Sequence, residues 1–300
     1  MIATPAKINL ALQVGAVDGR GYHPVDTLCV FIDAGDRLEW LGPDTAFSLE
    51  VTGHYAPSLA SVPPAHNLVL KGARQFAETF GGGPGRFRLH KAVPPASGIG
   101  GGTANGVGAL YLMNRQLAKP LDGPAMIRFA RCLGADGPVC MASLVARGNS
   151  FRARGVGERV TDGPILPPLS LCLVNPGEAV STATVFRLFD SHPVPEKLDL
   201  PWPPNVTTVS RMGDWMTHSR NDLAPPAMAL APSIGRLVDE MAASPGCVAA
   251  RMSGSGATVF GLFSSGPAAE RRARQFRGRG LWSVGGPIWG GAQQSGAGNG

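Results

Sequence analysis

Hydrophobic residues in the first half of the chain follow two alternating patterns. Runs rich in β-branched and aromatic residues are typical of strands, and they lie at residues 6–14, 27–41, 47–51 and 86–91. Apolar residues at helical intervals predict helices over 67–80, from Val107 onward and over 125–134. Strands and helices thus mix without a strict strand-helix-strand order, which favours an α+β fold with mixed sheets over a doubly wound sheet.

A proline-rich segment just after residue 160 separates this half from a second one of similar make-up. The patterns beyond it predict an apolar strand within 163–176, helices at 181–189 and 227–241, strands at 247–254 and 257–263, a basic helix, and a last strand at 280–286. We therefore expect two domains, at 1–160 and 161–288, followed by a flexible, glycine-rich tail at 289–300.

Composition indicates a globular protein and excludes several classes of site. Of the 300 residues, 44% are hydrophobic and 16% charged, which allows a sizeable apolar core. No apolar run approaches the roughly 20 residues of a membrane span, and the start of the chain lacks a secretory pattern, so we expect a cytoplasmic protein without a membrane partner. The five cysteines are scattered and form no C-x-x-C pair, which argues against both a disulfide framework and a zinc site.

The charge of the chain raises the question of a nucleic-acid partner. The net charge is +6, but the basic residues are mostly dispersed, and the late run ERRARQFRGRG contains a single aromatic residue. We interpret this run as a solvated helix face and expect no nucleic-acid partner. A modest positive field also suits a small, highly phosphorylated substrate. We expect a monomer or a homodimer.

The first candidate for a functional site is the stretch PPASGIGGGTANG, at residues 94–106. Glycines beside small polar residues, just before a helix, let the backbone approach an anion and direct its N–H groups and the positive helix end at it. The stretch lacks the lysine of a P-loop and the later acidic residue of a dinucleotide site. Taken alone it leaves a phosphate cradle and a flexible turn as equal alternatives.

Two other motifs decide between these alternatives. Together with the glycine stretch they resemble, in order and spacing, the three motifs of the GHMP small-molecule kinases. The three segments are PAKINLAL at 5–12, PPASGIGGGTAN and RMSGSGATVF at 251–260. Five further segments are similar to sequences of one branch of that family, whose acceptor is a methylerythritol carrying cytidine diphosphate. They are GRGYHPVDTL, LGADGPVC, GVGE, VSTATVF and NDL. The resemblance covers residues 1–288.

This resemblance implies a fold and a reaction. It implies a two-domain GHMP kinase fold with the active site in the cleft between the domains. It also implies ATP with Mg²⁺ as phosphoryl donor, and transfer to the 2-hydroxyl of the cytidyl diphosphate sugar alcohol in non-mevalonate isoprenoid precursor synthesis. Phosphoryl transfer needs charge neutralisation and an in-line acceptor more than covalent chemistry, so cations and N–H donors are expected around one proton acceptor.

The catalytic residues implied by the resemblance are Lys7 and Asp136. Asp136 would orient the acceptor hydroxyl and accept its proton, while Lys7 would keep the carboxylate ionised and offset charge on the transferred group. By residue type alone, Lys7 reads as a surface lysine on an edge strand and Asp136 as a turn or capping aspartate. The motif context favours the catalytic interpretation.

The resemblance also assigns the two binding sites. The nucleotide is assigned to Asn67, Lys91, Pro94, Ser97, Gly98, Ile99, Gly100, Gly101, Gly102 and Thr103, with Asn67 and Lys91 at the adenine end and Thr103 near Mg²⁺. The acceptor is assigned to Asn9, Tyr22, His23, Thr182, Phe186, Ser253 and Gly254, with Tyr22 and Phe186 stacking on cytosine and His23 reading its edge. Asn67 also fits a helix N-cap, Phe186 a core residue and His23 a turn residue.

Two other functions stay open at this point. One is a GHMP kinase for another small alcohol, of the homoserine or mevalonate type. The other is a non-catalytic binder of nucleotide or RNA. The sequence also departs from the family at Gly137, where a valine is usual, at Ala104, where a serine is usual, and by about five extra residues before Gly155.

Overall fold

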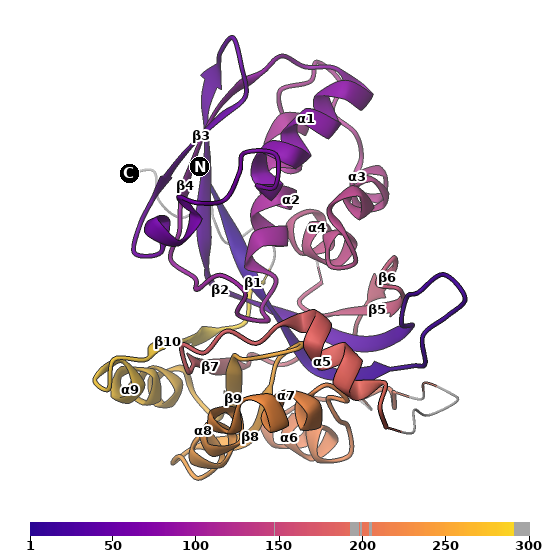
Figure 1. The fold of residues 1–300 in the computed structure, drawn as a ribbon. Helices are drawn as coiled ribbons and strands as arrows, with labels where there is room; N and C mark the ends of the chain where they lie inside the picture. The colour runs from indigo at the N-terminus through magenta and orange to yellow at the C-terminus, as the bar shows by residue number, and fades with distance from the viewer. Residues whose placement is uncertain (147, 193–197, 199, 204–205, 291–300) are drawn as a thin grey trace.

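The computed structural model describes residues 1–290 except 147, 193–197, 199 and 204–205, and the described chain forms two β-sheets flanked by helices (Figure 1). The larger sheet has the order β3-β4-β2-β5-β6, with β1 paired along β2. Its strands are β1 (Ile2–Val14), β2 (Val25–Pro43), β3 (Ser48–Thr52), β4 (Gly85–His90), β5 (Phe151–Gly155) and β6 (Arg159–Asp162). The smaller sheet has the order β10-β7-β9-β8, from β7 (Ser170–Asn175), β8 (Cys247–Met252), β9 (Val259–Phe263) and β10 (Trp282–Pro287).

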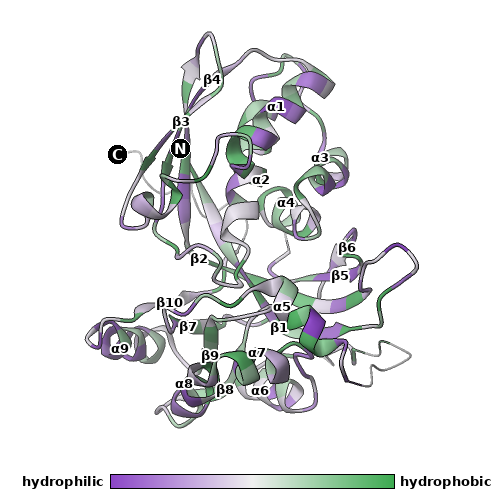
Figure 2. Cartoon of the chain, viewed as in Figure 1, coloured by the Kyte–Doolittle hydropathy of each residue, from purple (hydrophilic) through white to green (hydrophobic). Residues whose placement is uncertain are grey.

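The helices divide between the two sheets (Figure 1). The larger sheet carries α1 (Leu68–Phe80), α2 (Gly101–Asn114), α3 (Gly123–Phe129) and α4 (Gly137–Val145). The smaller sheet carries α5 (Thr182–Phe189), α6 (Val209–Thr217), α7 (Ala224–Leu230), α8 (Pro232–Ala242) and α9 (Gly266–Arg277). Figure 2 shows hydrophilic residues on the outward sides of α1 and α9 and hydrophobic ones in β7 and β9, the arrangement that buries the apolar faces. None of these described helices is long and apolar enough to cross a membrane.

Most predicted elements are present, and the differences have local causes. The expected helix at 227–241 is two helices, because the chain leaves helical geometry at Ala231 and restarts at Pro232, a residue suited to the first helical position. The expected helix at 125–134 ends at Phe129 and continues as a short 3-10 helix, Ala130–Leu133. Helix α4 is not predicted from the sequence, because its residues up to Leu144 are buried on every side and so lack an amphipathic period.

Helix α2 packs among the helices that cover the larger sheet and is buried on almost every side. Two of its glycines permit this position, because neighbouring backbone and side chains leave no room for a Cβ at Gly106 and Gly108. A Cβ at Gly106 would lie 2.9 Å from the Leu68 carbonyl oxygen, and one at Gly108 would lie 2.7 Å from the Thr4 methyl carbon. The glycine-rich sequence therefore lets α2 pack closely against both α1 and β1.

A β-bulge interrupts the pairing of β1 with β2. Thr4 pairs with Asp36 and Ala6 pairs with Ile32, so one residue on β1, Pro5, faces three on β2. Proline has no N–H to donate to a sheet, which accounts for the position of the bulge. At Gly35 a Cβ would lie 1.8 Å from the Thr4 carbonyl oxygen, so the close crossing of the strands requires glycine there.

The last described residues return to the larger sheet. Ile288 forms a bridge with Ile32, and the backbone N–H of Trp289 donates to the Phe31 carbonyl at 2.6 Å. The Trp289 indole donates to the Ser143 carbonyl of α4 at 3.1 Å, and the residue is 7% exposed. The tail predicted from 289 thus begins with a packed residue, while residues 291–300 lie outside the described chain.

Replacing Trp289 by alanine is expected to lower the free energy of unfolding by about 3–5 kcal/mol, because it removes a large buried side chain and leaves the Ser143 carbonyl without its donor. Urea unfolding followed by circular dichroism measures the change. Trp202→Ala is the control, since Trp202 is 46% exposed and its loss should cost about 1 kcal/mol or less. Equal losses for both variants would contradict the packing role of Trp289.

Candidate active site

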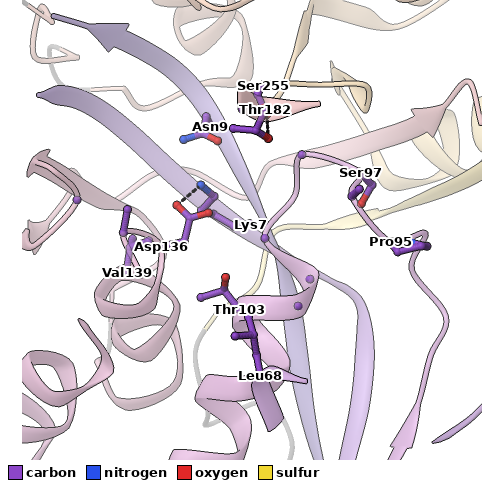
Figure 3. A pocket seen from close by; sticks show the side chains of 18 of the residues that line it. Lys7, Asn9, Leu68, Pro95, Ser97, Thr103, Asp136, Val139, Thr182 and Ser255 are labelled. Carbon is purple, nitrogen blue, oxygen red and sulfur yellow. Dashed lines mark hydrogen bonds and ion pairs between the residues drawn. The ribbon is translucent and has the colours of Figure 1, made fainter. Parts of the chain in front are cut away.

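A cavity of about 690 Å³ lies where the two predicted domains meet. Its wall comes from β1, β2, the start of α1, the 94–100 loop with the first turn of α2, the residues around Asp136, α5 and the turn after β8. Figure 3 shows Lys7, Asp136 and Thr103 pointing toward one another in this cavity. All of the predicted site residues line it except Ile99 and Ser253.

Lys7 and Asp136 form an ion pair inside the cavity, with Lys7 Nζ donating to Asp136 Oδ1 at 2.6 Å (Figure 3). Lys7 comes from the middle of β1 and is buried, with 7% of its side chain exposed. Asp136 lies immediately before α4, and 40% of its side chain is exposed. The pair therefore presents a carboxylate to the cavity and keeps its cation behind it.

The surroundings of this pair keep the cation charged. Burial alone lowers the pKa of the Lys7 ammonium, but the Asp136 carboxylate outweighs it and the pKa is raised above its ordinary value. Burial also raises the pKa of the neighbouring Cys29 and Cys140 thiols, which stay protonated. Lys7 is consequently a fixed positive charge beside Asp136 across the ordinary pH range.

The 94–100 loop is held through its carbonyl groups. The Ser97 carbonyl accepts from the Thr258 hydroxyl at 2.6 Å, and the Ile99 carbonyl accepts from the Lys7 backbone N–H at 2.9 Å. A planar trans peptide points its N–H opposite its carbonyl, so the N–H groups of the following residues face away from β1 and the 253–258 turn. Ala96, with a φ of 50°, lies in a left-handed conformation that side chains disfavour, a strain typical of functional loops.

Glycines bring this loop into contact with both other motifs. A Cβ at Gly98 would lie 2.3 Å from the Gly256 carbonyl oxygen, so only glycine lets the loop touch that turn. Gly100, with a φ of 67°, is the N-cap of α2, and its Cβ position lies 3.5 Å from Lys7 Cβ and 3.7 Å from Asp136 Oδ2. The positive end of α2 therefore opens directly beside the ion pair.

Asn67 and Lys91 lie on the side of the cavity predicted to hold adenine. The Asn67 side chain accepts from the Val69 N–H at 3.0 Å, so it caps α1 as well as lining the cavity. Leu59, Val62 and Leu68 line the same region and give it an apolar wall. Lys91 lines the cavity but is only 3% exposed, and its ammonium donates to Asp36 Oδ2 at 2.7 Å.

The predicted acceptor residues form the other end of the cavity. Tyr22 is 59% exposed at its rim, and Phe186 makes a tilted ring contact with His23 at 4.8 Å between centroids. His23 Nδ1 lies 2.9 Å from the Gly15 carbonyl oxygen, which can only accept, so Nδ1 is the donor in this contact. His23 Nε2 lies 3.4 Å from Asp190 Oδ2. The sequence predicted that Tyr22 and Phe186 stack on cytosine, and this stays a prediction; in the structure the ring in contact with Phe186 is that of His23.

Asn9 lies between the ion pair and this acceptor end. Its Nδ2 donates to the Thr27 hydroxyl at 2.8 Å, while its Oδ1 is buried without a hydrogen-bond partner. An unpaired buried oxygen is costly, so Oδ1 is an acceptor ready for a ligand hydroxyl. Thr182 and Ser255 share a hydrogen bond of 2.8 Å across the same wall (Figure 3).

Two predicted residues lie behind the cavity wall. The Ile99 side chain is fully buried in the apolar core between the sheets, so the residue acts through its backbone only. The Ser253 hydroxyl accepts from the Asn9 backbone N–H at 3.1 Å and is also fully buried. Both therefore shape the site without lining it.

Comparisons with known proteins agree with this geometry. The family models for the GHMP kinases N terminal domain and the GHMP kinases C terminal match residues 67–143 and 205–280. Proteins named 4-diphosphocytidyl-2-C-methyl-D-erythritol kinase from Cereibacter sphaeroides (strain ATCC 17029 / ATH 2.4.9) and Caulobacter vibrioides (strain NA1000 / CB15N) are 46% and 38% identical to the chain. The alignments cover 89% and 90% of this chain and 91% and 92% of those proteins. The chain belongs to the GHMP kinase family.

Its place among the GHMP kinases is with the 4-diphosphocytidyl-2-C-methyl-D-erythritol kinases, as the segments GRGYHPVDTL, LGADGPVC, GVGE, VSTATVF and NDL indicated. A crystal structure of 4-(cytidine 5'-diphospho)-2C-methyl-D-erythritol kinase has a TM-score of 0.74 at 28% identity, covering 95% of this chain and 98% of that one. A homoserine kinase from Cytophaga hutchinsonii shares the fold, with a TM-score of 0.64 at 19% identity, covering 94% and 92%. The expected GHMP kinase fold is confirmed.

The structure explains the glycine at 137, where the GHMP kinases it resembles usually have valine. A Cβ at this position would lie 1.9 Å from the Ala130 carbonyl oxygen, so the 3-10 helix before it packs directly on the start of α4. Gly137 N–H also donates to the Gly134 carbonyl at 3.1 Å. The glycine thus permits a tight backbone contact beside Asp136.

Gly137→Ala is expected to lower the free energy of unfolding by about 1–3 kcal/mol, because the added methyl group forces backbone apart in a packed region. Chemical denaturation measures the change. Gly266→Ala is a matched control, since Gly266 also precedes a proline at the start of a helix and its Cβ would meet the Ser170 hydroxyl oxygen at an ordinary 3.6 Å. If both variants were as stable as the wild type, the inferred contact would be wrong.

Proposed function

We propose that this chain transfers the γ-phosphoryl group of ATP to the 2-hydroxyl of 4-diphosphocytidyl-2-C-methyl-D-erythritol in isoprenoid precursor synthesis, in the cytoplasm. The observation that carries the proposal is the position of Gly100, the N-cap of α2, beside the ion pair, where an added Cβ would lie 3.5 Å from Lys7 Cβ and 3.7 Å from Asp136 Oδ2. A phosphate bound at that helix end lies beside the Asp136 carboxylate, which faces the cavity. The kinase activity and the ATP dependence follow from the GHMP kinase family.

Lys7 and Asp136 take distinct roles in this proposal. The Asp136 carboxylate is exposed to the cavity and accepts the hydrogen bond of the acceptor hydroxyl, which aligns that oxygen with the γ-phosphorus. It takes the proton late, as the new bond forms, because phosphoryl transfer depends on positioning and charge more than on a strong base. Lys7 holds the carboxylate in place and offsets negative charge on the transferred group.

The phosphates are held mainly by the loop. Both lysines that line the cavity already pair with carboxylates, so backbone N–H groups and the α2 N-terminus carry most of the binding. The described residues contain no group of three or more His, Cys, Asp or Glu side chains suited to a metal. Mg²⁺ therefore fits as a partner of the phosphate oxygens, with the Thr103 hydroxyl on the first turn of α2 as the protein ligand (Figure 3). When bound it supplies charge neutralisation.

The acceptor fits the opposite end. Tyr22, His23 and Phe186 offer ring faces and a polar edge of the kind that a cytosine requires. The unpaired Asn9 Oδ1 and the hydroxyl of Thr182 suit the hydroxyl-rich methylerythritol, which then lies between the cytosine and Asp136. A GHMP kinase for a smaller alcohol has no use for this aromatic end, which favours the cytidyl acceptor.

The purified protein, given ATP and Mg²⁺, is expected to phosphorylate 4-diphosphocytidyl-2-C-methyl-D-erythritol and neither homoserine nor mevalonate. Asp136→Asn should lower kcat by about 10²- to 10⁴-fold, the usual contribution of an acid-base group, with ATP binding nearly unchanged. A coupled assay for ADP measures both. Asp239→Asn, an exposed aspartate on α8, serves as the control.

Each outcome of this assay has a separate meaning. Transfer to another acceptor would keep the phosphate site and overturn the acceptor assignment. Unchanged turnover by Asp136→Asn would remove Asp136 from the mechanism. ATP binding without transfer to any of the three acceptors would contradict the proposed activity itself.

Tyr22→Ala is expected to raise KM for the cytidyl acceptor by about tenfold with little change in kcat, because stacking holds the ligand equally in the ground and transition states. Steady-state kinetics at saturating ATP provide the measurement. Tyr22→Phe keeps the ring and should behave as the wild type. An equal loss toward an acceptor without cytosine would show that Tyr22 does not bind the base.

A further inference from the structure

Asp36 is a buried carboxylate that none of the three sequence motifs contains. It lies on β2 beside the bulge and is 1% exposed. Its Oδ1 accepts from the backbone N–H groups of Ala92 and Val93 at 2.8 and 3.0 Å. Its Oδ2 accepts from Lys91 Nζ and from Asn105 Nδ2, both at 2.7 Å. Both oxygens are therefore fully used, and none of these bonds involves solvent.

These partners lie at the two ends of the 94–100 loop. Ala92 and Val93 lead into the loop from β4, and Asn105 lies in α2, which follows it. A single carboxylate thus joins the chain before the loop to the chain after it. Thr4 extends the connection to β1, because its hydroxyl lies 2.7 Å from Asn105 Oδ1 and 3.0 Å from the Asp36 carbonyl oxygen.

The Lys91 and Asp36 pair lies directly under the N-terminus of α2. The Cβ position of Gly101 is 3.8 Å from Lys91 Nζ and 4.0 Å from Asp36 Oδ2. Lys91 Nζ also donates to the Val93 carbonyl at 2.6 Å, so its hydrogen bonds point to the loop entrance and not to a nucleotide. Burial lowers the pKa of this ammonium, and the Asp36 carboxylate opposes that effect. The ammonium of Lys91 is therefore paired with a carboxylate inside the protein.

We propose that Asp36 is a positioning residue that fixes the conformation of the phosphate loop by holding both of its ends, with Lys91 as its main partner. The inference rests on the proposed function, since it assumes that the loop binds ATP. Its physical basis is that buried, fully satisfied polar networks admit one geometry, because any displacement leaves a donor or a charge unpaired. Lys91 then supports the nucleotide site from below and does not bind adenine through its ammonium.

Asp36→Asn tests the proposal with little change of shape. The amide oxygen can still accept from Ala92 and Val93, but the amide nitrogen faces the donors of Lys91 and Asn105, so the loop loses one end of its support. Titration calorimetry should show that the dissociation constant of a non-hydrolysable ATP analogue with Mg²⁺ rises by about tenfold or more. The dissociation constant of 4-diphosphocytidyl-2-C-methyl-D-erythritol should stay within about twofold.

Asp26→Asn is the matched control. Asp26 is also a buried aspartate on β2 with a cationic partner, since its Oδ2 accepts from Arg152 at 2.5 Å, but it lies away from the loop. This variant is expected to lose stability while binding the ATP analogue as the wild type does. A selective effect of Asp36→Asn on the ATP analogue then reports on the loop and not on general destabilisation.

Thr4→Val provides a second, milder variant in case Asp36→Asn does not fold. It removes the hydroxyl that bonds Asn105, leaves no charge unpaired, and should weaken binding of the ATP analogue by about threefold to fivefold. If the variants destabilised the protein but left the ratio of the two dissociation constants unchanged, Asp36 would be merely structural. A wild-type protein that bound no ATP analogue would instead overturn the proposed function, and this inference with it.

Discussion

The ion pair between Lys7 and Asp136 is the interaction on which the site depends. Its two members are 129 residues apart, one on the first strand and one at the start of α4, and they meet at 2.6 Å. The Lys7 backbone also donates to the Ile99 carbonyl, so one residue of β1 contacts both the carboxylate and the 94–100 loop. Groups from three distant segments are thereby held in one geometry, and in the proposed reaction such positioning would lower the entropic cost of transfer.

Close backbone approach is the second constraint, and glycine is how the sequence meets it. Gly98 touches the Gly256 carbonyl, Gly106 lets α2 approach α1, and Gly137 lets Asp136 sit against the preceding 3-10 helix. None of these contacts is possible with a side chain at the glycine position. The glycines of the 94–106 stretch, which taken alone left a flexible turn open, therefore serve close packing at Gly98 and Gly106.

The sequence was sufficient for the fold class, for most elements and for the residues that meet in the cavity. The motifs PAKINLAL and PPASGIGGGTAN located Lys7 and the loop, and the segment LGADGPVC located Asp136, because each is local in sequence. The GHMP kinase fold is confirmed. Helix α4 was missed because a helix buried on every side has no amphipathic period. The ring partner of Phe186 and the partner of Lys91 could not be predicted, because both contacts join residues far apart in the chain and depend on tertiary packing.

The two lysine–aspartate pairs show why burial must be known before a role can be assigned. Lys7 with Asp136 and Lys91 with Asp36 have the same chemistry, nearly equal distances and neighbouring positions around the same loop. In the first pair the carboxylate is 40% exposed and retains capacity to accept a hydrogen bond from a ligand, whereas in the second all four bonds to the carboxylate come from the protein. Exposure of the carboxylate, which no residue type encodes, is therefore the basis on which we propose a proton-accepting role for the first pair and a positioning role for the second.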